Sequence, residues 1–292
     1  MSLTFTITPK KRFLRFHRAL SVREALALGP EGLQPFGIDD EDLEDLLRAS
    51  LRDAVVHVGV PELSGRGCEL SFEGGAYVVR EFTPATPVDW RLALDLLAAL
   101  SQHLEAPIVD EDGAIWSAET ITEFDYSTDI AAGIQVMTRH PGDGTMLHGI
   151  IRPVSLTVAM IEDIRTAISP IERFGEIFTE IQDEPGYDAR LQLSEAPDGS
   201  VLGLYALSEG VRTVLPRTPY IDPTIYPELR SEDVTWKLVL VVDGESEEPE
   251  LAGEIGYAEA LARLDASSVH ALDDASLVVH ELSGDAIRAL AG

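Results

Sequence analysis

The chain has 292 residues, of which 45% are hydrophobic and 25% are charged, so it can bury a sizeable core and is not expected to be disordered. Asp and Glu number 51 against 22 Lys and Arg, a net charge of −29 at pH 7, which repels polyanions and disfavours nucleic acid and anionic membranes as partners. No segment approaches the roughly 18 consecutive apolar residues of a membrane helix, and the first residues lack the apolar run of a signal peptide. We therefore expect a cytoplasmic protein without nucleic-acid or membrane partners.

Strand signals begin the chain and recur between residues 55 and 82. Leu3, Phe5 and Ile7 alternate with threonines, which is the period of a half-buried strand. Residues 13–16 (FLRF) favour a returning strand. Short apolar runs broken by glycines over residues 55–82 favour further strands and a hairpin.

Capping signals predict three helices in the same region. Ser21 with Glu24 forms a capping box, which begins a short helix. A second helix begins near Asp39, and its apolar stripe has helical spacing: Leu43, Leu46, Leu47 and Leu51. The third helix begins at Thr86, followed by a proline at the first helical position and by Asp89 near the positive end of the helix dipole.

Residues 110–119 (DEDGAIWSAE) combine an acidic cluster, a glycine and a glutamate six residues beyond it. Aligning Gly113 with the glycine of an EF-hand loop places both aspartates and the last glutamate on ligand positions, but Ile108 then occupies the first position and cannot bind calcium. Asp-Gly is a preferred tight-turn pair. We therefore predict a strand, a tight turn and a short helix capped by Ser117, with a weak divalent-cation site as the alternative.

The chain is predicted to enter a second half near residue 130, which gives two halves, 1–130 and 131–292, joined by the polar loop 139–145. Helices are expected at about 157–168, 169–181 and 257–264 and from residue 285, and strands at 147–152, 191–193, 201–207, 235–242 and 277–280. The acidic run 244–250 is expected to be a solvated turn. Because strands and helices interleave irregularly, we predict an α+β fold with mixed or mainly antiparallel sheets and packed helices.

The loop Ser64-Gly65-Arg66-Gly67 is a candidate anion-binding site. Two glycines around an arginine can offer backbone N–H groups and a guanidinium to a phosphate or a carboxylate. The loop lacks both the GK[ST] ending of a P-loop and the GxGxxG spacing, and a strand is expected to follow it. A simple turn between strands is the alternative.

A basic cluster stands out against the acidic remainder of the chain. It consists of Lys10, Lys11, Arg12, Arg15 and Arg18. Such a cluster can bind an acidic partner or the protein's own acidic surface, and a solvated hairpin is the alternative.

Motifs for metal binding and for nucleophilic catalysis are missing from the sequence. The seven histidines form neither an HExxH motif nor an i, i+4 pair suited to zinc. Cys68 is the only cysteine, which excludes an intramolecular disulfide and a cysteine-based zinc site and favours a buried free thiol. We expect no metal and no cofactor.

Several segments together resemble a known family. They are LTFTITPKKRF, SGRGCEL, TPATPVDWRLALDLLAAL, IVDEDG, FDYSTDIAAGI and VLGLYALSEGVRTVLPRTPYI. This pattern resembles the bacterial proteins known as domain of unknown function 4299, a family that spans about the whole of a chain of this length. The resemblance implies a bacterial, cytoplasmic, single-chain protein, and it supplies neither an activity nor catalytic residues.

Two functions from different classes fit these observations. The first is a non-enzymatic protein that uses its own acidic surface to bind another protein, in the manner of an immunity or antitoxin-like partner. The bound protein would then be basic. The alternative is a small-molecule or metal-dependent enzyme whose site joins distant residues: Arg66, Glu111, Asp112 and His148. A deep pocket that gathers these four groups would favour the enzyme, and their dispersal would count against it.

Overall fold

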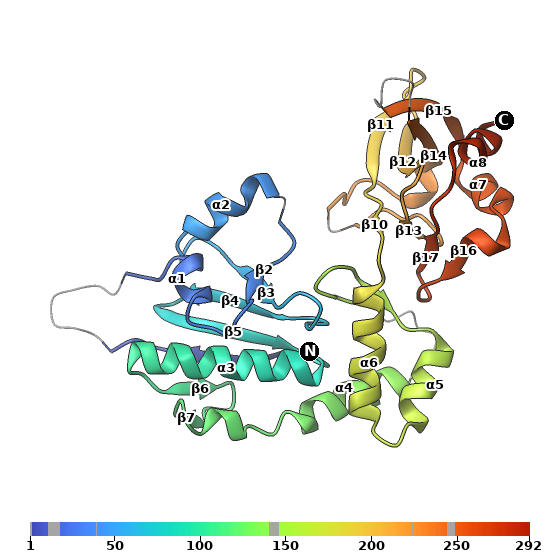
Figure 1. The fold of residues 1–292 in the computed structure, drawn as a ribbon. Helices are drawn as coiled ribbons and strands as arrows, with labels where there is room; N and C mark the ends of the chain where they lie inside the picture. The colour runs from blue at the N-terminus through green and yellow to red at the C-terminus, as the bar shows by residue number, and fades with distance from the viewer. Residues whose placement is uncertain (1, 11–17, 39, 140–145, 224, 244–248) are drawn as a thin grey trace. The chain divides into compact units, whose positions relative to one another are not determined.

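The computed structural model describes residues 2–10, 18–38, 40–139, 146–223, 225–243 and 249–292 (Figure 1). The chain forms two compact units, Met1–Asp183 and Glu184–Gly292. This boundary differs from the one predicted at 130/131, which falls inside helix α4 (Ser127–Arg139).

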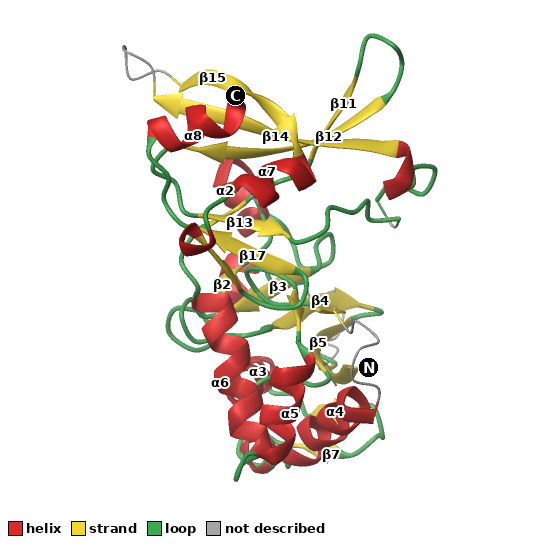
Figure 2. Cartoon of the chain, turned by 90° about the vertical axis from the view of Figure 1, so that its right-hand side faces the viewer, coloured by secondary structure: helices red, strands yellow, loops and turns green. Residues whose placement is uncertain are grey.

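Helix α4 belongs to the first unit because of its packing. It contacts helices α5 (Val158–Thr166) and α6 (Pro170–Asp183), and Figure 2 shows the three side by side. Gly133 lies buried in α4, where a Cβ would come within 2.7 Å of the Pro84 ring. Gly133 lies close to the predicted boundary between the halves, and its missing side chain permits the close approach of α4 and the loop that contains Pro84.

The first unit is built on an antiparallel sheet with the strand order β2-β3-β4-β5-β1-β6-β7. Its strands are β1 (Ser2–Ile7), β2 (Gln34–Pro35), β3 (Val56–Gly59), β4 (Cys68–Glu73), β5 (Ala76–Phe82), β6 (Ile108–Asp110) and β7 (Ile115–Trp116). Strand β1 lies between β5 and β6 and buries Phe5 and Ile7 completely, which confirms the strand predicted there. The predicted strand 13–16 lies outside the described residues.

Helix α3 (Pro87–Leu104) packs against β1 and β5 and supplies much of the core of this unit. The fully buried Trp90 meets Phe5 edge-on, with 6.3 Å between ring centroids, and stacks on Phe124. The capping box predicted at Ser21 is present, and Thr86, at the predicted start of α3, forms a second capping box with Asp89. The other elements are α1 (Val22–Leu26), α2 (Asp40–Arg48), the 3₁₀ turn η1 (Ile121–Glu123), β8 (Met146–Leu147) and β9 (Val154–Ser155).

The second unit contains two four-stranded sheets. One has the order β10 (Tyr187–Asp188), β13 (Thr213–Pro216), β17 (Ser276–Val279) and β16 (Val269–Ala271). The other has the order β11 (Gln192–Glu195), β12 (Val201–Ser208), β14 (Val234–Asp243) and β15 (Pro249–Gly256). In this sheet β12 and β14 are parallel, and helices α7 (Tyr257–Arg263) and α8 (Gly284–Ala291) pack against β14 and β15. The short turns are η2 (Ser231–Asp233) and η3 (Ala266–Ser268).

The predicted α+β class with mainly antiparallel sheets is confirmed. Strand β15 was not predicted. Its first two residues, 249 and 250, were expected to end a solvated turn over residues 244–250. Residues 244–248 of the predicted turn lie outside the described residues. The sequence of β15, PELAGEIG, has few β-branched residues and therefore carries a weak local strand signal. The strand is defined by its pairing with β14, which includes a register shift between Leu240 and Val241.

Candidate functional site

The loop Ser64–Gly67 is held by a carboxylate of the first unit itself. The backbone N–H groups of Arg66 and Gly67 donate to the two oxygens of the Asp89 carboxylate, each at 2.9 Å. The same carboxylate accepts hydrogen bonds from the N–H (3.2 Å) and the hydroxyl (2.7 Å) of Thr86. Asp89 is 1% exposed. It occupies the position that the sequence suggested for an external anion, and such an anion would have to displace it.

Both glycines of this loop are required by close packing. A Cβ on Gly65 would lie 2.7 Å from the Thr86 side chain, and a Cβ on Gly67 would lie 2.3 Å from the carbonyl oxygen of Val58. Gly67 also has a φ of +63°, in the left-handed region that favours glycine. Strand β4 follows directly, so the loop connects β3 and β4, as the sequence favoured.

The guanidinium of Arg66 joins distant segments in the interior. It donates through Nε to the carbonyl of His148 and through Nη1 to the carbonyl of Pro84, each at 2.7 Å, and it lies over the Phe82 ring at 5.0 Å. The His57 imidazole contacts the Arg66 carbonyl, and burial lowers the pKa of His57. Arg66 is 5% exposed, so this cation is part of the core.

Glu81 on strand β5 is a buried acid close to this loop. It is fully buried, and neither of its carboxylate oxygens has a hydrogen-bond partner in the described part of the chain. Burial, followed by the charge of Asp89, raises the pKa of Glu81 well above its usual range, and Arg66 acts in the opposite direction. Burial also raises the pKa of Cys68, which lies opposite Glu81 across β4 and β5. The thiol therefore stays protonated, unlike a catalytic thiolate.

The four groups of the alternative enzyme site are not joined into one constellation. Arg66 reaches His148 through the backbone carbonyl and not through the imidazole. Glu111 lies in the turn between β6 and β7, where it accepts a hydrogen bond from the Thr4 N–H at 3.3 Å, and Asp112 is exposed in the same turn. In the described ranges, no group of three or more His, Cys, Asp or Glu side chains could hold a metal ion.

The stretch 110–116 forms the tight turn that the sequence predicted. The Asp110 carboxylate accepts hydrogen bonds from the Ala114 N–H at 2.8 Å and from the Trp116 indole at 3.0 Å, and Gly113 has a φ of +82°. The Ser117 hydroxyl then accepts from two backbone N–H groups of the next turn, each at 3.3 Å. The predicted short helix is reduced to the 3₁₀ turn η1.

Calcium is not expected to bind at this turn, because hydrogen bonds to the turn itself already engage both Asp110 oxygens. Calorimetric titration of EDTA-treated protein with calcium up to about 1 mM should give no binding heat beyond dilution. A dissociation constant tighter than roughly 1 mM would contradict this interpretation.

Two members of the predicted basic cluster, Lys10 and Arg18, lie within the described residues. Lys10 is exposed, and Arg18 forms an ion pair with Glu24 at 2.5 Å. Lys11, Arg12 and Arg15 lie outside the described residues. Part of the positive charge of the cluster is therefore engaged by the capping glutamate of α1.

The second unit contains a polar cluster that the sequence did not suggest. Arg212 pairs with Glu184 and contacts Nδ1 of His280 at 3.1 Å, and His280 Nε2 lies 3.3 Å from Nδ1 of His270. His270 Nε2 in turn lies 3.5 Å from Glu184. The four side chains contact one another in a ring, while the buried Nε of Arg212 has no hydrogen-bond partner in the described part of the chain.

A cavity of about 490 Å³ also lies in the second unit, between α7 and the connection after β13. Its aromatic lining includes Trp236 and Tyr257. The polar groups there are largely engaged, since the Tyr257 hydroxyl donates to the Pro216 carbonyl at 2.5 Å and Glu259 pairs with Arg263 at 2.6 Å. This cavity is a weaker candidate for ligand binding.

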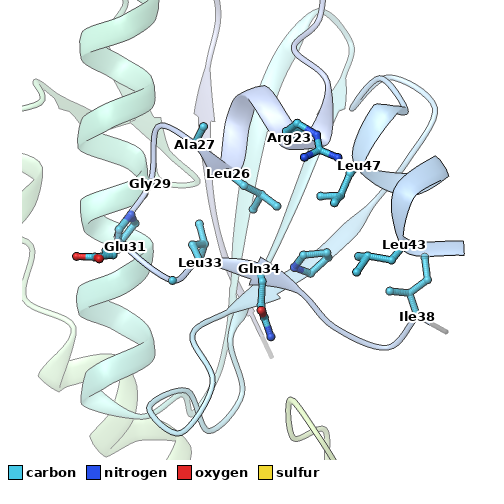
Figure 3. Close-up of a pocket in the computed structure, with 13 residues that line it drawn as sticks. Arg23, Leu26, Ala27, Gly29, Glu31, Leu33, Gln34, Ile38, Leu43 and Leu47 are labelled. Atoms are coloured by element: carbon cyan, nitrogen blue, oxygen red, sulfur yellow. The ribbon is translucent and has the colours of Figure 1, made fainter. Parts of the chain in front are cut away.

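The first unit carries a larger groove between α1, α2 and β2, with a volume of about 640 Å³ (Figure 3). Its lining combines aliphatic side chains with the polar side chains of Arg23, Glu31 and Gln34. Helix α1 contributes Leu26, the connection after it contributes Leu33 and Ile38, and α2 contributes Leu43 and Leu47. Figure 3 shows leucines from both helices directed toward the same space. We take this groove as the candidate functional site.

Helix α2 leaves its apolar stripe incompletely buried. Leu43, Leu46 and Leu47 of the predicted stripe are each only half-buried, whereas the leucines of α3 at 94, 97 and 100 are buried. The fourth member of the predicted stripe, Leu51, lies beyond the end of α2 and is buried. An amphipathic helix usually buries its apolar face against a core. The stripe of α2 therefore offers apolar surface to the groove.

Negative charge lies in the first turn of α2, outside the residues that line the groove. Glu41 and Asp42 are exposed in the first turn of α2 and form no ion pair within the described ranges. Glu44, by contrast, pairs with Arg23 at 2.9 Å and with Arg48 at 3.3 Å. Uncompensated negative charge is thus concentrated at the N-terminus of α2, where the helix dipole stabilises it.

Sequence reasoning missed the groove although it identified one wall. The spacing of the leucines in α2 indicated an apolar face, without indicating what covers that face. The course of the connection 27–38, which leaves the face open, has no local signal beyond Gly29-Pro30.

These features define an acidic α+β protein of two compact units, the first of which carries a leucine-lined groove beside an acidic helix. The chain belongs to the family described as Domain of unknown function (DUF4299), whose model matches residues 2–290, and the predicted resemblance is thereby confirmed. Neither the search of curated proteins nor the search of solved structures found a match. Among the described helices, none has the length and apolar character needed to cross a membrane.

Proposed function

We propose that this protein acts by binding another protein with a positively charged surface, in the manner of an immunity or antitoxin-like partner, and not by catalysis. The observation that carries the proposal is the leucine-lined groove of the first unit, together with the unpaired acids in the first turn of α2, one of its walls. The proposed setting is the bacterial cytoplasm, which the family resemblance implies.

Charge and apolar surface would contribute differently to such a complex. With 51 acidic and 22 basic side chains, at least 29 acids cannot be matched one to one by Lys or Arg of the same chain, since 51 − 22 = 29. The resulting field attracts a basic partner and accelerates association, and salt screens it. The groove would add apolar contacts from which water is excluded, and such contacts slow the dissociation of a complex.

The proposal is tested by isolating a partner and then measuring the complex with pure components. The immobilised full-length chain is exposed to a lysate of its source cells, bound proteins are eluted with salt, and the main component is purified. We expect a basic protein that forms a saturable complex in calorimetry, with a dissociation constant that rises with salt. If the captured proteins lack a basic surface, or if none saturates, the proposal is wrong.

A further inference from the structure

The groove has the walls of a site for a helix. Leu26 of α1 and the pair Leu43 and Leu47, one turn apart on α2, face the same space from two helices. Ridges of side chains from a third helix can fill the space between two such helices. Helix-in-groove recognition uses apolar anchors at i, i+3 or i+4, and i+7 of the bound helix.

Strand addition at this groove is disfavoured by the edge strand β2. This strand has two residues and ends at Pro35, and the following Phe36 N–H donates inward to the His57 carbonyl at 2.9 Å. Because successive backbone N–H groups of a strand point to opposite sides, the outward donor position falls on Pro35, which has no N–H. An added strand would therefore lack a ladder hydrogen bond there.

The charges beside the groove indicate the polar face of its occupant. Of the two charged residues that line the groove, Arg23 already pairs with an acid of α2, whereas Glu31 is exposed and forms no ion pair in the described ranges. Glu41 and Asp42, exposed and without an ion pair in the described ranges, add negative charge in the first turn of α2, outside the lining. Lysine or arginine flanking the apolar anchors of a bound helix would meet this charge. An acidic or neutral helix would leave it uncompensated.

We infer that the groove between α1, α2 and β2 binds an amphipathic helix of the partner, with aliphatic anchors on one face and Lys or Arg beside them. This inference rests on the proposed function and deepens it, since it names the site and the form of the bound segment. The half-buried leucines of α2 are then the surface that the partner helix covers.

The test uses the full-length chain and a fluorescein-labelled 18-residue helical peptide with leucines on one face and lysines at both ends. A peptide of the same composition, with the leucines spread around the helix, serves as control. Fluorescence anisotropy should show the amphipathic peptide binding at least about tenfold more tightly than the control. Leu43→Gln, checked for helix content by circular dichroism, should weaken its binding by about the same factor.

A charge variant tests the same site without removing an apolar contact. Asp42→Lys should weaken binding several-fold at low salt and less at high salt. Glu172→Lys is the matched control, because Glu172 is also an exposed acid at the third position of its helix, α6, and forms no ion pair in the described ranges. It should leave binding unchanged.

The outcomes separate this inference from the proposed function. If both peptides bind equally and salt releases both, or if Leu43→Gln and Asp42→Lys bind like the unchanged protein, the helix-in-groove inference is wrong while binding of a basic protein can still stand. If a basic partner saturates the chain but the amphipathic peptide does not bind, the inference alone fails. If neither a basic partner nor the amphipathic peptide binds, the proposed function and the helix-in-groove inference both fail.

Discussion

Replacing Asp89 with alanine is expected to lower the free energy of unfolding of the first unit by about 3–5 kcal/mol, the usual cost of removing one member of a buried, hydrogen-bonded charged set. The change leaves the N–H groups of Arg66 and Gly67 without their acceptor and removes one half of the capping box of α3. Urea unfolding followed by tryptophan fluorescence measures the effect. In a Trp236→Phe background, the remaining tryptophans, Trp90 and Trp116, both report on the first unit.

The matched control for this prediction is an ordinary helix cap. Thr157 caps α5 through a hydrogen bond from the Met160 N–H at 3.1 Å, and Thr157→Ala should cost about 1 kcal/mol. If Asp89→Ala costs no more than Thr157→Ala, then Asp89 acts as a cap only, and the loop amides find other acceptors.

Replacing Glu81 with methionine is expected to stabilise the first unit at pH 8 by about 1–3 kcal/mol, the range for a buried polar group that lacks a hydrogen-bond partner. Both carboxylate oxygens are fully buried without a partner in the described residues. Methionine has a similar length and no group that must be hydrated. Thermal and urea unfolding at several pH values measure the gain.

The pH dependence of this gain follows from the raised pKa of Glu81. Above pH 4.5 the unfolded chain releases the Glu81 proton while the folded chain keeps it, so the folded state binds more protons and its stability falls as the pH rises toward the folded-state pKa. The gain from Glu81→Met should therefore grow from pH 4.5 upward. Glu123→Met, at an exposed acid of η1, should change stability by less than about 0.5 kcal/mol. Destabilisation by Glu81→Met at pH 8 would show that the carboxylate makes a stabilising contact, with Arg66, whose charge acts to lower the Glu81 pKa, as the candidate.

Elements with a complete local signal were predictable from the sequence. The capping box at Ser21, the helix start at Thr86 and the Asp-Gly turn after β6 are each specified within a few residues, and all three are present. Strand β15 and the division between the units were not predictable in this way. The strand is defined by its pairing with β14, and the boundary is defined by the packing of α4 on α5 and α6.

The candidate site also depends on contacts between distant segments, which local sequence signals do not specify. Asp89 was recognised as a helix-start acid, but its hydrogen bonds to the loop amides join residues 22 and 23 positions apart, which no spacing rule describes. The leucine stripe of α2 was recognised, but periodicity reports which face of a helix is apolar and not what covers it. The groove depends on that second property.

Arg66 makes distant parts of the first unit depend on one another. Its acceptors are the carbonyl of Pro84, 18 residues away, and the carbonyl of His148, 82 residues away. Loop-closure entropy grows only slowly with length, whereas a buried cation without an acceptor is costly. Its native position is therefore favourable only when the connection between β5 and α3 and the segment after α4 are both in place, which couples the sheet and the helices beyond it into one cooperative structure. A division of the chain at residue 130 would separate this cation from one of its acceptors.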